Sequence, residues 1–330
     1  MNQPHNILTA TYRIVTPMYL GDAGGTAESL RPPSFKGALR FWWRTLNWAK
    51  IRANNSTDKD ALIALHQEES ELFGNTPNSD KPNIGQALFS IKIDSTNLPR
   101  PTPERFSDGR SYLGYGLSDR IGGALGSGQF TVELIYSPKR LTSSRQESIK
   151  DALTALGLFG GLGGRSRNGF GSMAIESINE QGFPCNTLQN YKAHVQTLID
   201  RYPIEKVGLP PFTAFSKHTL ISCSSNHTGA EAMHSCVGRK YKSFRESIDL
   251  NARKPFGLPL SRVDTSNRRA SPLLIHMHPL DEQEDQAFSV YTYIPAKFHH
   301  DALYEDERIE FFSNVKEFAG DSLHRETIYP

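Results

Sequence analysis

Cysteine is scarce in this chain of 330 residues, which has only three, far apart in the sequence. An odd and scattered set of thiols does not form the disulfide framework of a secreted domain. No uninterrupted apolar run approaches the ~20 residues that a membrane-spanning helix needs, and the N-terminus lacks the basic start and apolar core of a signal peptide. These absences lead us to expect a cytoplasmic protein without a membrane partner.

Net charge is also small, at +2, but it is unevenly distributed. The segment from Asp281 to the end has twelve acids and four lysines or arginines, a balance of −8, so residues 1–280 carry +10. This asymmetry suggests a basic body that binds polyanions and an acidic end that faces away from them. A solvated surface with uneven charge fits the same numbers.

Two kinds of apolar pattern indicate an α+β chain. Alternation typical of strands occurs at 8–14, 87–93, 130–136 and 170–178. Helical spacing occurs at 35–49, 61–73 and 149–159. Ser34 precedes the first helical pattern and is the expected N-cap. Together these elements have the order of the β-α-β-β-α-β unit of a ferredoxin-like domain.

A second, less regular set of elements follows. Strands are expected near 212–223, 273–278 and 287–294, and a helix near 231–250. We therefore expect two ferredoxin-like (RRM-like) domains with long insertions, residues 1–190 and residues 205–330. The boundary is expected within 181–211, where the sequence becomes polar and contains proline. The stretch 96–128 is rich in Pro, Gly, Ser and Arg, and loops of this length are usually functional.

Three cations form a stripe on the first expected helix, since Lys36, Arg40 and Arg44 are spaced at i, i+4 and i+8. The stretch 31–52, which begins with Arg31, contains no acid. Like charges at this spacing repel one another mildly, so an anionic partner such as an RNA backbone would stabilise them. Long side chains that merely cover a hydrophobic helix are the alternative.

Tryptophans lie beside this stripe. Trp43 and Trp48 flank it and could stack on bases, whereas Trp42 falls on the apolar side and is expected in the core. Because tryptophan is highly buried on average, the core is the alternative for Trp43 and Trp48 as well.

Glycine makes up seven of the fifteen residues in 157–171. Such a backbone can approach a partner closely and present N–H groups to phosphate, with arginines supplying charge. The segment lacks the lysine of a Walker loop, and its partial dinucleotide fingerprint precedes an expected strand where a helix is required. A tight helix-to-strand connection without a ligand is the alternative. We expect its arginines to lie at the surface; the candidate RNA contacts are Gly163, Gly164, Arg165, Arg167 and Gly169.

Metal and catalytic sites are weakly indicated. Cys223, His227, His234 and Cys236 have ligand atoms suited to zinc, but their spacing fits no familiar zinc motif, which favours scattered polar residues. Asp22 lies beside glycines, where aspartate is typical of a turn, and no second acid nearby completes a metal site. We expect no catalytic residue, metal or cofactor. The alternative is an endoribonuclease that uses Asp22 with a metal, or a histidine base without one.

Two segments resemble a known family. The stretch 31–44, RPPSFKGALRFWWR, closely resembles the signature helix of the first subunit of the Cmr effector complexes of type III-B CRISPR systems. The stretch 163–171, GGRSRNGFG, resembles the glycine-rich loop of the RAMP (repeat-associated mysterious protein) superfamily, to which that subunit belongs. Further similarity to the same subunit occurs at 16–21, 256–259 and 268–273.

This resemblance implies two ferredoxin-like RAMP domains, in agreement with the order of elements above. It also implies an RNA-binding subunit without catalytic activity, which holds the 3′ part of the CRISPR RNA, the target RNA or both, in antiviral defence. The implied partners are the CRISPR RNA, the target RNA and the other Cmr subunits. The chain departs from the family pattern after Asp281.

Overall fold

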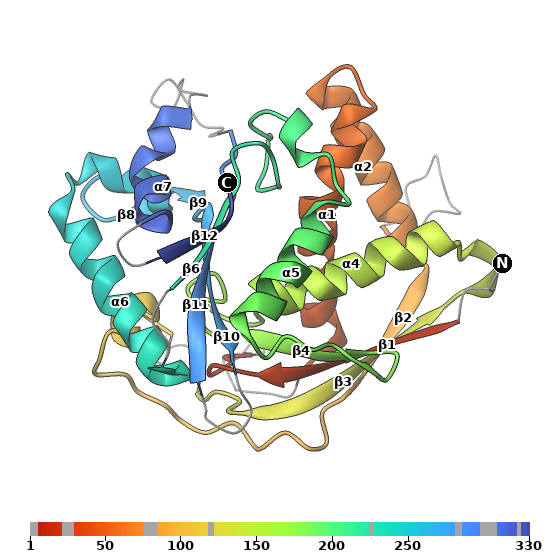
Figure 1. Cartoon of the computed structure of the whole chain (residues 1–330), viewed down its shortest axis with the longest axis horizontal. Coiled ribbons are helices and arrows are strands. Elements are labelled where there is room, and N and C mark those ends of the chain that lie inside the picture. The colour runs from red at the N-terminus through yellow and green to blue at the C-terminus, as the bar shows by residue number, and fades with distance from the viewer. Residues whose placement is uncertain are drawn as a thin grey trace.

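The chain folds into two antiparallel sheets, and the strands of each come from successive halves of the sequence (Figure 1). The structure is a computed structural model. The residues that it describes are 6–21, 30–75, 85–117, 122–224, 228–280, 286–297, 309–321 and 325–330. Within these ranges, none of the helices combines the length and the apolar character that a membrane crossing requires.

The first half forms a five-stranded sheet with helices on one side. Its elements are β1 (Ile7–Ile14), α1 (Pro32–Ala53), α2 (Asp58–Phe73), β2 (Phe89–Asp94), α3 (Arg110–Leu113), β3 (Gly128–Tyr136), a 3-10 helix (Pro138–Arg140), α4 (Ser143–Phe159), β4 (Met173–Ile178) and β5 (Gln181–Gly182). The strand order is β2-β3-β1-β4-β5, with every pair antiparallel. The order of strands and long helices along the chain agrees with the prediction.

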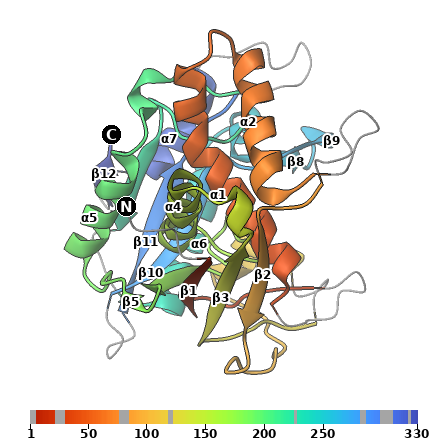
Figure 2. The ribbon, with the colours of Figure 1, turned by 90° about the vertical axis from the view of Figure 1, so that its right-hand side faces the viewer.

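Alternating burial along β1 determines which face of this sheet is covered. Leu8, Ala10, Tyr12 and Ile14 are buried, because successive side chains of a strand point to opposite faces. Helices α1 and α4 lie over this face (Figures 1 and 2). The Tyr12 hydroxyl donates to the carbonyl oxygen of Leu153 in α4 at 2.9 Å, so the strand is fixed to the helix by a buried hydrogen bond.

The opposite face of the first sheet is polar. Arg13 pairs with Glu176 at 2.8 Å, and Lys92 pairs with Glu133 at 3.2 Å. The outward residues of β1, β2 and β3 include no aromatic ring. RRM domains stack bases on aromatic side chains of their sheet, so this sheet face lacks the groups for that mode of RNA binding.

Helix α1 begins earlier than the apolar pattern indicated. Its N-cap residue is Arg31, two prolines occupy the first turn, and no side chain caps it. Ser34 therefore lies inside the helix, and its predicted role as N-cap is wrong. Proline suits the first turn because its missing N–H would have no partner there in any case.

The second half forms a smaller sheet with a similar element order. Its elements are α5 (Leu188–Ile199), a 3-10 helix (Ile204–Lys206), β6 (Leu220–Ser224), β7 (Thr228–Gly229), α6 (Ala230–Ser247), a 3-10 helix (Asn251–Phe256), β8 (Leu258–Leu260), β9 (Asp264–Arg269), β10 (Leu273–Pro279), β11 (Gln286–Tyr293), a 3-10 helix (Ile309–Phe312), α7 (Ser313–Ala319) and β12 (Arg325–Tyr329). The main strands have the order β10-β11-β6-β12, β7 pairs with β11, and β8 and β9 form a separate hairpin.

Both faces of this second sheet are covered. Every residue of β10 and nearly every residue of β11 is buried, without the alternation seen in β1. Helices α6 and α7 contact β11 on one side, and α4 contacts β10 and β11 from the first half. Strands that are buried on both faces consist of near-continuous apolar runs, so the second sheet forms the middle layer of the molecule.

The polar stretch 181–211 contains a helix that the sequence analysis did not anticipate. Thr187 caps α5 by accepting from the N–H of Asn190 at 3.1 Å, and Tyr191 and Val195 are fully buried. Helix α5 contacts both α4 and β12. One cluster of buried apolar residues continues from the first sheet into the second.

Other differences concern the less regular segments. The strand expected near 212–223 begins only at Leu220, and the β8–β9 hairpin, α7 and β12 were not predicted. The insertion at 96–128 is anchored to α6, where a Cβ on Gly238 would lie 2.0 Å from the carbonyl oxygen of Gly109. Much of the acidic end, 281–285, 298–308 and 322–324, lies outside the described residues.

Candidate nucleic-acid interface

A surface hollow of about 1180 Å³ lies where the glycine-rich loop meets the second half. The segments that line it are 112–117, 164–168, 256–261 and 268–271, with Tyr241 and Arg245 of α6. Its charged lining residues are Arg165, Arg167, Arg245, Arg268 and Arg269, and among the residues that the structure describes no acid lines it. Because no lining carboxylate offsets these charges, this arginine hollow is suited to a phosphate backbone.

Aromatic rings line the same hollow. The Arg245 guanidinium lies 5.6 Å from the ring centre of Tyr241, 5.8 Å from that of Phe256 and 5.9 Å from that of Tyr112. Its Nε is buried without a hydrogen-bond partner among the described atoms. The ring of Tyr115 is 79% exposed at the rim. Tyr112 is half-buried, whereas Tyr241 and Phe256 are buried, so Tyr115 offers the exposed ring. A cation beside an exposed ring is the combination that binds unpaired nucleotides, by phosphate contact and base stacking together.

Two of the arginines in the hollow keep their charge at the surface. Arg165 is exposed in a left-handed backbone conformation (φ 58°), and it donates from Nη2 to the carbonyl oxygen of Tyr115 at 2.8 Å. Arg268 in β9 is exposed and forms no ion pair within the described ranges. Both guanidinium groups are therefore available to an anion in the hollow.

Arg167 differs from this pattern, because its side chain is half-buried and is held by contacts within the protein. It donates from Nη1 to the carbonyl oxygen of Ser271 at 2.5 Å and lies 5.0 Å from the ring centre of Phe41 in α1. Burial, together with nearby Arg269, lowers the pKa of Arg167 to about 10. Its side chain joins the glycine-rich loop to both halves of the molecule.

The glycines of the loop are required by contacts within the protein. Gly163 has φ +89°, and a Cβ there would lie 2.3 Å from the carbonyl oxygen of Tyr19. The N–H of Gly164 donates to that same oxygen at 2.8 Å. Gly169 has φ +85°, and a Cβ there would lie 2.9 Å from Nε2 of His234. Contacts within the protein alone therefore exclude side chains at these positions. This agrees with the alternative that the segment is a tight helix-to-strand connection.

The cationic stripe of α1 packs against α2. Arg40 pairs with the buried carboxylate of Glu69, and Nε of Arg44 lies 3.6 Å from the same carboxylate. Burial and the nearby Arg40 lower the pKa of Lys36. Arg31, ahead of the helix, donates to the carbonyl oxygen of Gly21 at 3.2 Å. Much of the stripe's charge is therefore offset within the protein.

A different stripe of α1 faces the glycine-rich loop. A second hollow, of about 300 Å³, is lined by Ser34, Ala38 and Phe41 on the helix side and by Ser166 and Arg167, among others, on the loop side. Positions 38 and 40 differ by roughly 200° around a helix of about 3.6 residues per turn. The loop and the cationic stripe therefore do not face each other across one groove.

The comparisons with known proteins agree with the resemblance noted in the sequence. The family model described as the RAMP superfamily matches residues 11–174, about half of the chain. The chain belongs to the RAMP superfamily. A curated RAMP relative, "CRISPR system Cmr subunit Cmr1-1" of Pyrococcus furiosus, is 28% identical over 277 residues, covering 74% of this chain and 75% of the relative.

Solved structures have the same fold. The apo crystal structure of Cmr1 from Pyrococcus furiosus matches with a TM-score of 0.63 at 21% identity, over 98% of both chains. A chain of the type III-B Cmr-beta complex bound to cognate target RNA and AMPPnP matches with a TM-score of 0.60 at 12% identity, over 96% of this chain and 99% of that one. At these identities the likeness shows the fold.

The three tryptophans of this RAMP chain are core residues. Trp42, Trp43 and Trp48 are each at most 2% exposed. The hypothesis that Trp43 or Trp48 stacks on bases is therefore wrong, because neither ring face is accessible. The exposed ring in the arginine hollow is that of Tyr115, and Tyr112 beside it is half-buried.

The zinc and nuclease alternatives gain no support in the described part of this RAMP chain. No group of three or more His, Cys, Asp or Glu side chains able to hold a metal occurs there. Cys223 is buried beside the carbonyl oxygen of Glu326, and His234 contacts that of Asn168. Asp22 and His227 lie outside the described residues.

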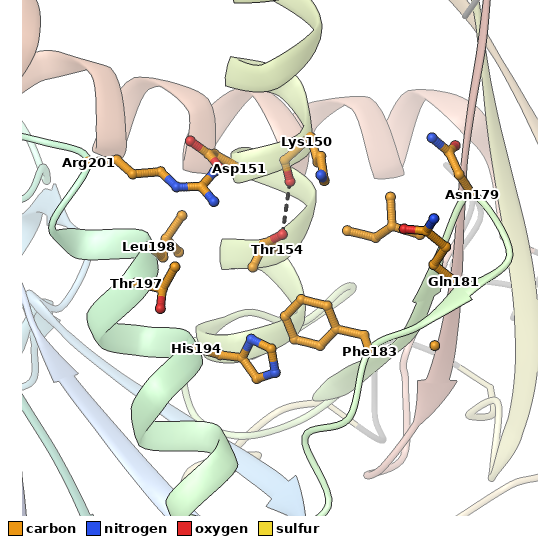
Figure 3. Close-up of a pocket in the computed structure, with 12 residues that line it drawn as sticks. Lys150, Asp151, Thr154, Asn179, Gln181, Phe183, His194, Thr197, Leu198 and Arg201 are labelled. Carbon is orange, nitrogen blue, oxygen red and sulfur yellow. Dashed lines mark hydrogen bonds and ion pairs between the residues drawn. The ribbon is translucent and has the colours of Figure 1, made fainter.

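A smaller hollow of about 200 Å³ lies between α4, α5 and the β4–β5 turn (Figure 3). Its acidic side chain is already paired, since Asp151 accepts from Arg201 at 2.5 Å and from the Tyr202 hydroxyl at 2.9 Å. On another wall, the rings of Phe183 and His194 stack at 4.0 Å. Paired charges make this hollow a weaker candidate for an anionic ligand than the arginine hollow.

Several residues of the arginine hollow were missed as site residues in the sequence. Tyr112 and Tyr115 lie in the insertion at 96–128, whose length alone was a signal of function. Arg268 lies in a stretch noted only for its resemblance to RAMP proteins. Arg245 lies four residues after Tyr241 on α6, a local pairing that the sequence analysis did not use, and its other two rings come from other segments.

Proposed function

We propose that this chain is an RNA-binding structural subunit of a type III-B CRISPR (Cmr) effector complex, and that RNA lies in the arginine hollow. Its partners are then the CRISPR RNA, the target RNA and the other Cmr subunits, and its share of the RNA is the 3′ part of the CRISPR RNA, the target RNA or both. The relatives named as Cmr1, and the fold shared with a chain of a target-bound Cmr complex, support the assignment.

One observation carries the RNA-binding part of this proposal. Five arginines, three tyrosines and a phenylalanine line one hollow, and no acidic side chain lines it within the described part of the chain. Phosphate neutralisation supplies affinity without regard to sequence, and base stacking on aromatic rings is tolerant of sequence. A subunit that holds guide RNAs of many sequences requires both properties.

We further infer that each half is a ferredoxin-like domain, residues 1–190 and residues 205–330. The relative strand order of the first sheet, β2-β3-β1-β4, recurs in the second as β10-β11-β6-β12. In both halves a long helix follows the first of these strands, and another helix precedes the last. That is the arrangement of the β-α-β-β-α-β unit.

The experiment that tests RNA binding removes exposed charge from the hollow. Arg268→Ala and Arg165→Ala should each weaken binding to oligouridine by about tenfold, the loss of one charge-assisted contact. Lys139→Ala, an exposed cation outside the hollow, is the matched control and should bind as the parent does. Equal affinity for all four proteins, or no binding by the parent, would refute the proposal.

The chain is proposed to act without catalysis of its own. General acid–base cleavage needs a base within hydrogen-bond reach of the attacking hydroxyl and a partner to orient it. His234, His276 and His278 are buried with their ring nitrogens directed at protein groups. Incubating the full chain with labelled RNA, with and without divalent metal, should leave the RNA intact; defined fragments would favour the nuclease.

A further inference from the structure

Two buried histidines of the second half hold the two ends of the glycine-rich loop. His234 in α6 donates from Nε2 to the carbonyl oxygen of Asn168, and His276 in β10 donates from Nδ1 to that of Gly160, each at 2.8 Å. A carbonyl oxygen only accepts hydrogen bonds, so each contact determines which ring nitrogen carries the proton. Between these two carbonyls, residues 164–167 line the arginine hollow and residues 161–163 line the second hollow.

The environment of His234 accepts only its neutral form. The space for its ring comes from Gly169, where a Cβ would lie 2.9 Å from Nε2. Its Nδ1 is buried without a partner, so a second proton would create a buried donor with no acceptor. Burial lowers the pKa of His234 to about 4, and the nearest charged groups are Arg110 and Asp108.

His276 and the neighbouring His278 make three contacts of hydrogen-bond length, but in their neutral forms they have only two ring protons for them. Nε2 of His276 lies 3.3 Å from Nδ1 of His278, whose Nε2 lies 3.2 Å from the carbonyl oxygen of Cys185. Together with the Gly160 contact, three hydrogen bonds require three ring protons, and two neutral imidazoles carry two. The contact of His276 with Gly160 is the shortest of the three, at 2.8 Å, so we assign a proton to it. The contact that lacks a proton is then one of the two that His278 makes.

The surroundings of this pair disfavour a third proton. Burial lowers the pKa of His276 to about 4 and lowers that of His278 strongly. Arg13 and His194 add positive charge near His278. The titratable groups around the pair on neighbouring segments are Arg13 of β1, Glu176 of β4, Cys185, and Tyr191 and His194 of α5.

We propose that His234 and His276 are positioning residues for RNA binding, whose neutral rings hold the glycine-rich loop in the shape that lines the arginine hollow. This proposal rests on the proposed function of the hollow. The loop is held when both donors are present and uncharged. It is released when a donor is removed, or when acid charges a ring that has no buried counter-charge.

The experiment compares substitutions that keep a donor with substitutions that remove it, in the full chain. His234→Gln and His276→Asn place an amide N–H near the lost ring N–H and do not titrate, whereas His234→Leu and His276→Leu remove the donor. We expect the Leu double variant to bind oligouridine at least about tenfold more weakly, and the Gln/Asn double variant to stay within about threefold. Tyr202→Phe, which loses a buried hydrogen bond to Asp151 away from the loop, is the control for general destabilisation.

Hydrogen exchange measures the loop without RNA. The protection factors of the Gly164 and Asn168 amides, which bond to Tyr19 and Arg165, report whether the loop is in place. In the parent, these protection factors should fall by about tenfold per histidine between pH 7.5 and 5.5, because the released rings titrate near 6.5 and the held rings near 4. The Gln/Asn variant should lose this pH dependence.

The outcomes separate the two proposals. If the parent does not bind RNA but the exchange results hold, the function of the hollow is wrong and the positioning of the loop stands. If the Leu variant keeps full loop protection and affinity, the positioning proposal is overturned. If the Leu variant does not fold, the pH dependence of the loop protection factors is compared between the parent and the Gln/Asn variant. Equal pH dependence in these two proteins would overturn the proposal.

Discussion

The guanidinium of Arg167 lies 5.0 Å from the ring centre of Phe41, so the glycine-rich loop and the first long helix meet through a half-buried cation–π contact. The same guanidinium donates to the carbonyl oxygen of Ser271 in the second half. Arg165, two residues earlier, is exposed in the arginine hollow. Two arginines of one motif therefore have different roles, and substitutions should separate them.

Arg167→Ala should lower the free energy of unfolding by about 1 to 3 kcal/mol, because it leaves the Ser271 carbonyl without its donor and removes the contact with Phe41. Arg165→Ala should change it by no more than about 0.5 kcal/mol, as is usual for surface positions. Urea denaturation of the two single variants checks both values. Equal stability of the two proteins would contradict the assignment of Arg167 as structural.

Affinity for single-stranded RNA should fall steeply with salt. Each phosphate that a cation neutralises contributes a slope of about −0.7 to the plot of log affinity against log salt. Arg268→Ala should therefore make the slope shallower by roughly that amount, since it removes one exposed charge. Titrations of oligouridine between low and moderate salt measure the slopes, and a salt-independent parent would show that phosphates do not dominate binding.

Gly163→Ala should destabilise the protein, and Gly37→Ala should not. At Gly163 a Cβ would lie 2.3 Å from the backbone oxygen of Tyr19, in a left-handed conformation that alanine rarely adopts. At Gly37, inside α1, a Cβ would have no atom within 4 Å, so alanine should stabilise the helix by up to about 1 kcal/mol. Thermal melting of the pair measures the difference, and a shift in the same direction for both would count against the packing of the loop.

Glu69→Gln tests the role of the cationic stripe. The buried carboxylate offsets the charge of Arg40 and approaches Arg44, so its loss should lower stability by about 1 kcal/mol, a modest value because both arginines reach solvent. If the stripe binds RNA as predicted, the freed arginines should raise RNA affinity. Glu68→Gln, an exposed neighbour, is the control for each measurement. Unchanged RNA affinity in Glu69→Gln would show that the cationic stripe of α1 does not contact RNA.

Acid should destabilise the fold through its buried histidines. Burial holds the pKa values of His234 and His276 near 4, below the ~6.5 of an exposed ring, so the unfolded chain binds more protons in this range. The free energy of unfolding should therefore be at its full value above about pH 6.5 and should decrease as pH falls toward 4. Denaturation at a series of pH values measures this slope, and the His234→Gln, His276→Asn variant should show a shallower one.

The main elements of the first half could be predicted because their signals are local. The stripe of α1 and the alternation of β1 each repeat within one segment, and burial in the structure follows them. Helix α5 was missed because its apolar face is narrow, and Tyr191 and Val195 stand among polar residues. The short β8–β9 hairpin is largely exposed, so its sequence has little alternation to detect.

The candidate site could be predicted only in part, because it is assembled from distant segments. The glycine-rich loop is visible as a motif, but whether Arg167 is exposed or buried depends on Phe41 and Ser271, more than a hundred residues away from it on either side. Two of the three aromatic partners of Arg245, Tyr112 and Phe256, likewise come from other parts of the chain. No local pattern contains that information.

The connection between the glycine-rich loop and β10 has a consequence for how the molecule can be divided. The backbone at Asn168 bridges to Ile275, and the N–H of Ile275 donates to the carbonyl oxygen of Arg167 at 2.8 Å. The loop thus acts as a short extra strand on the edge of a sheet built from the other half of the sequence. A fragment ending at residue 190 would contain every residue of the loop but would lack the strand β10 that pairs with it.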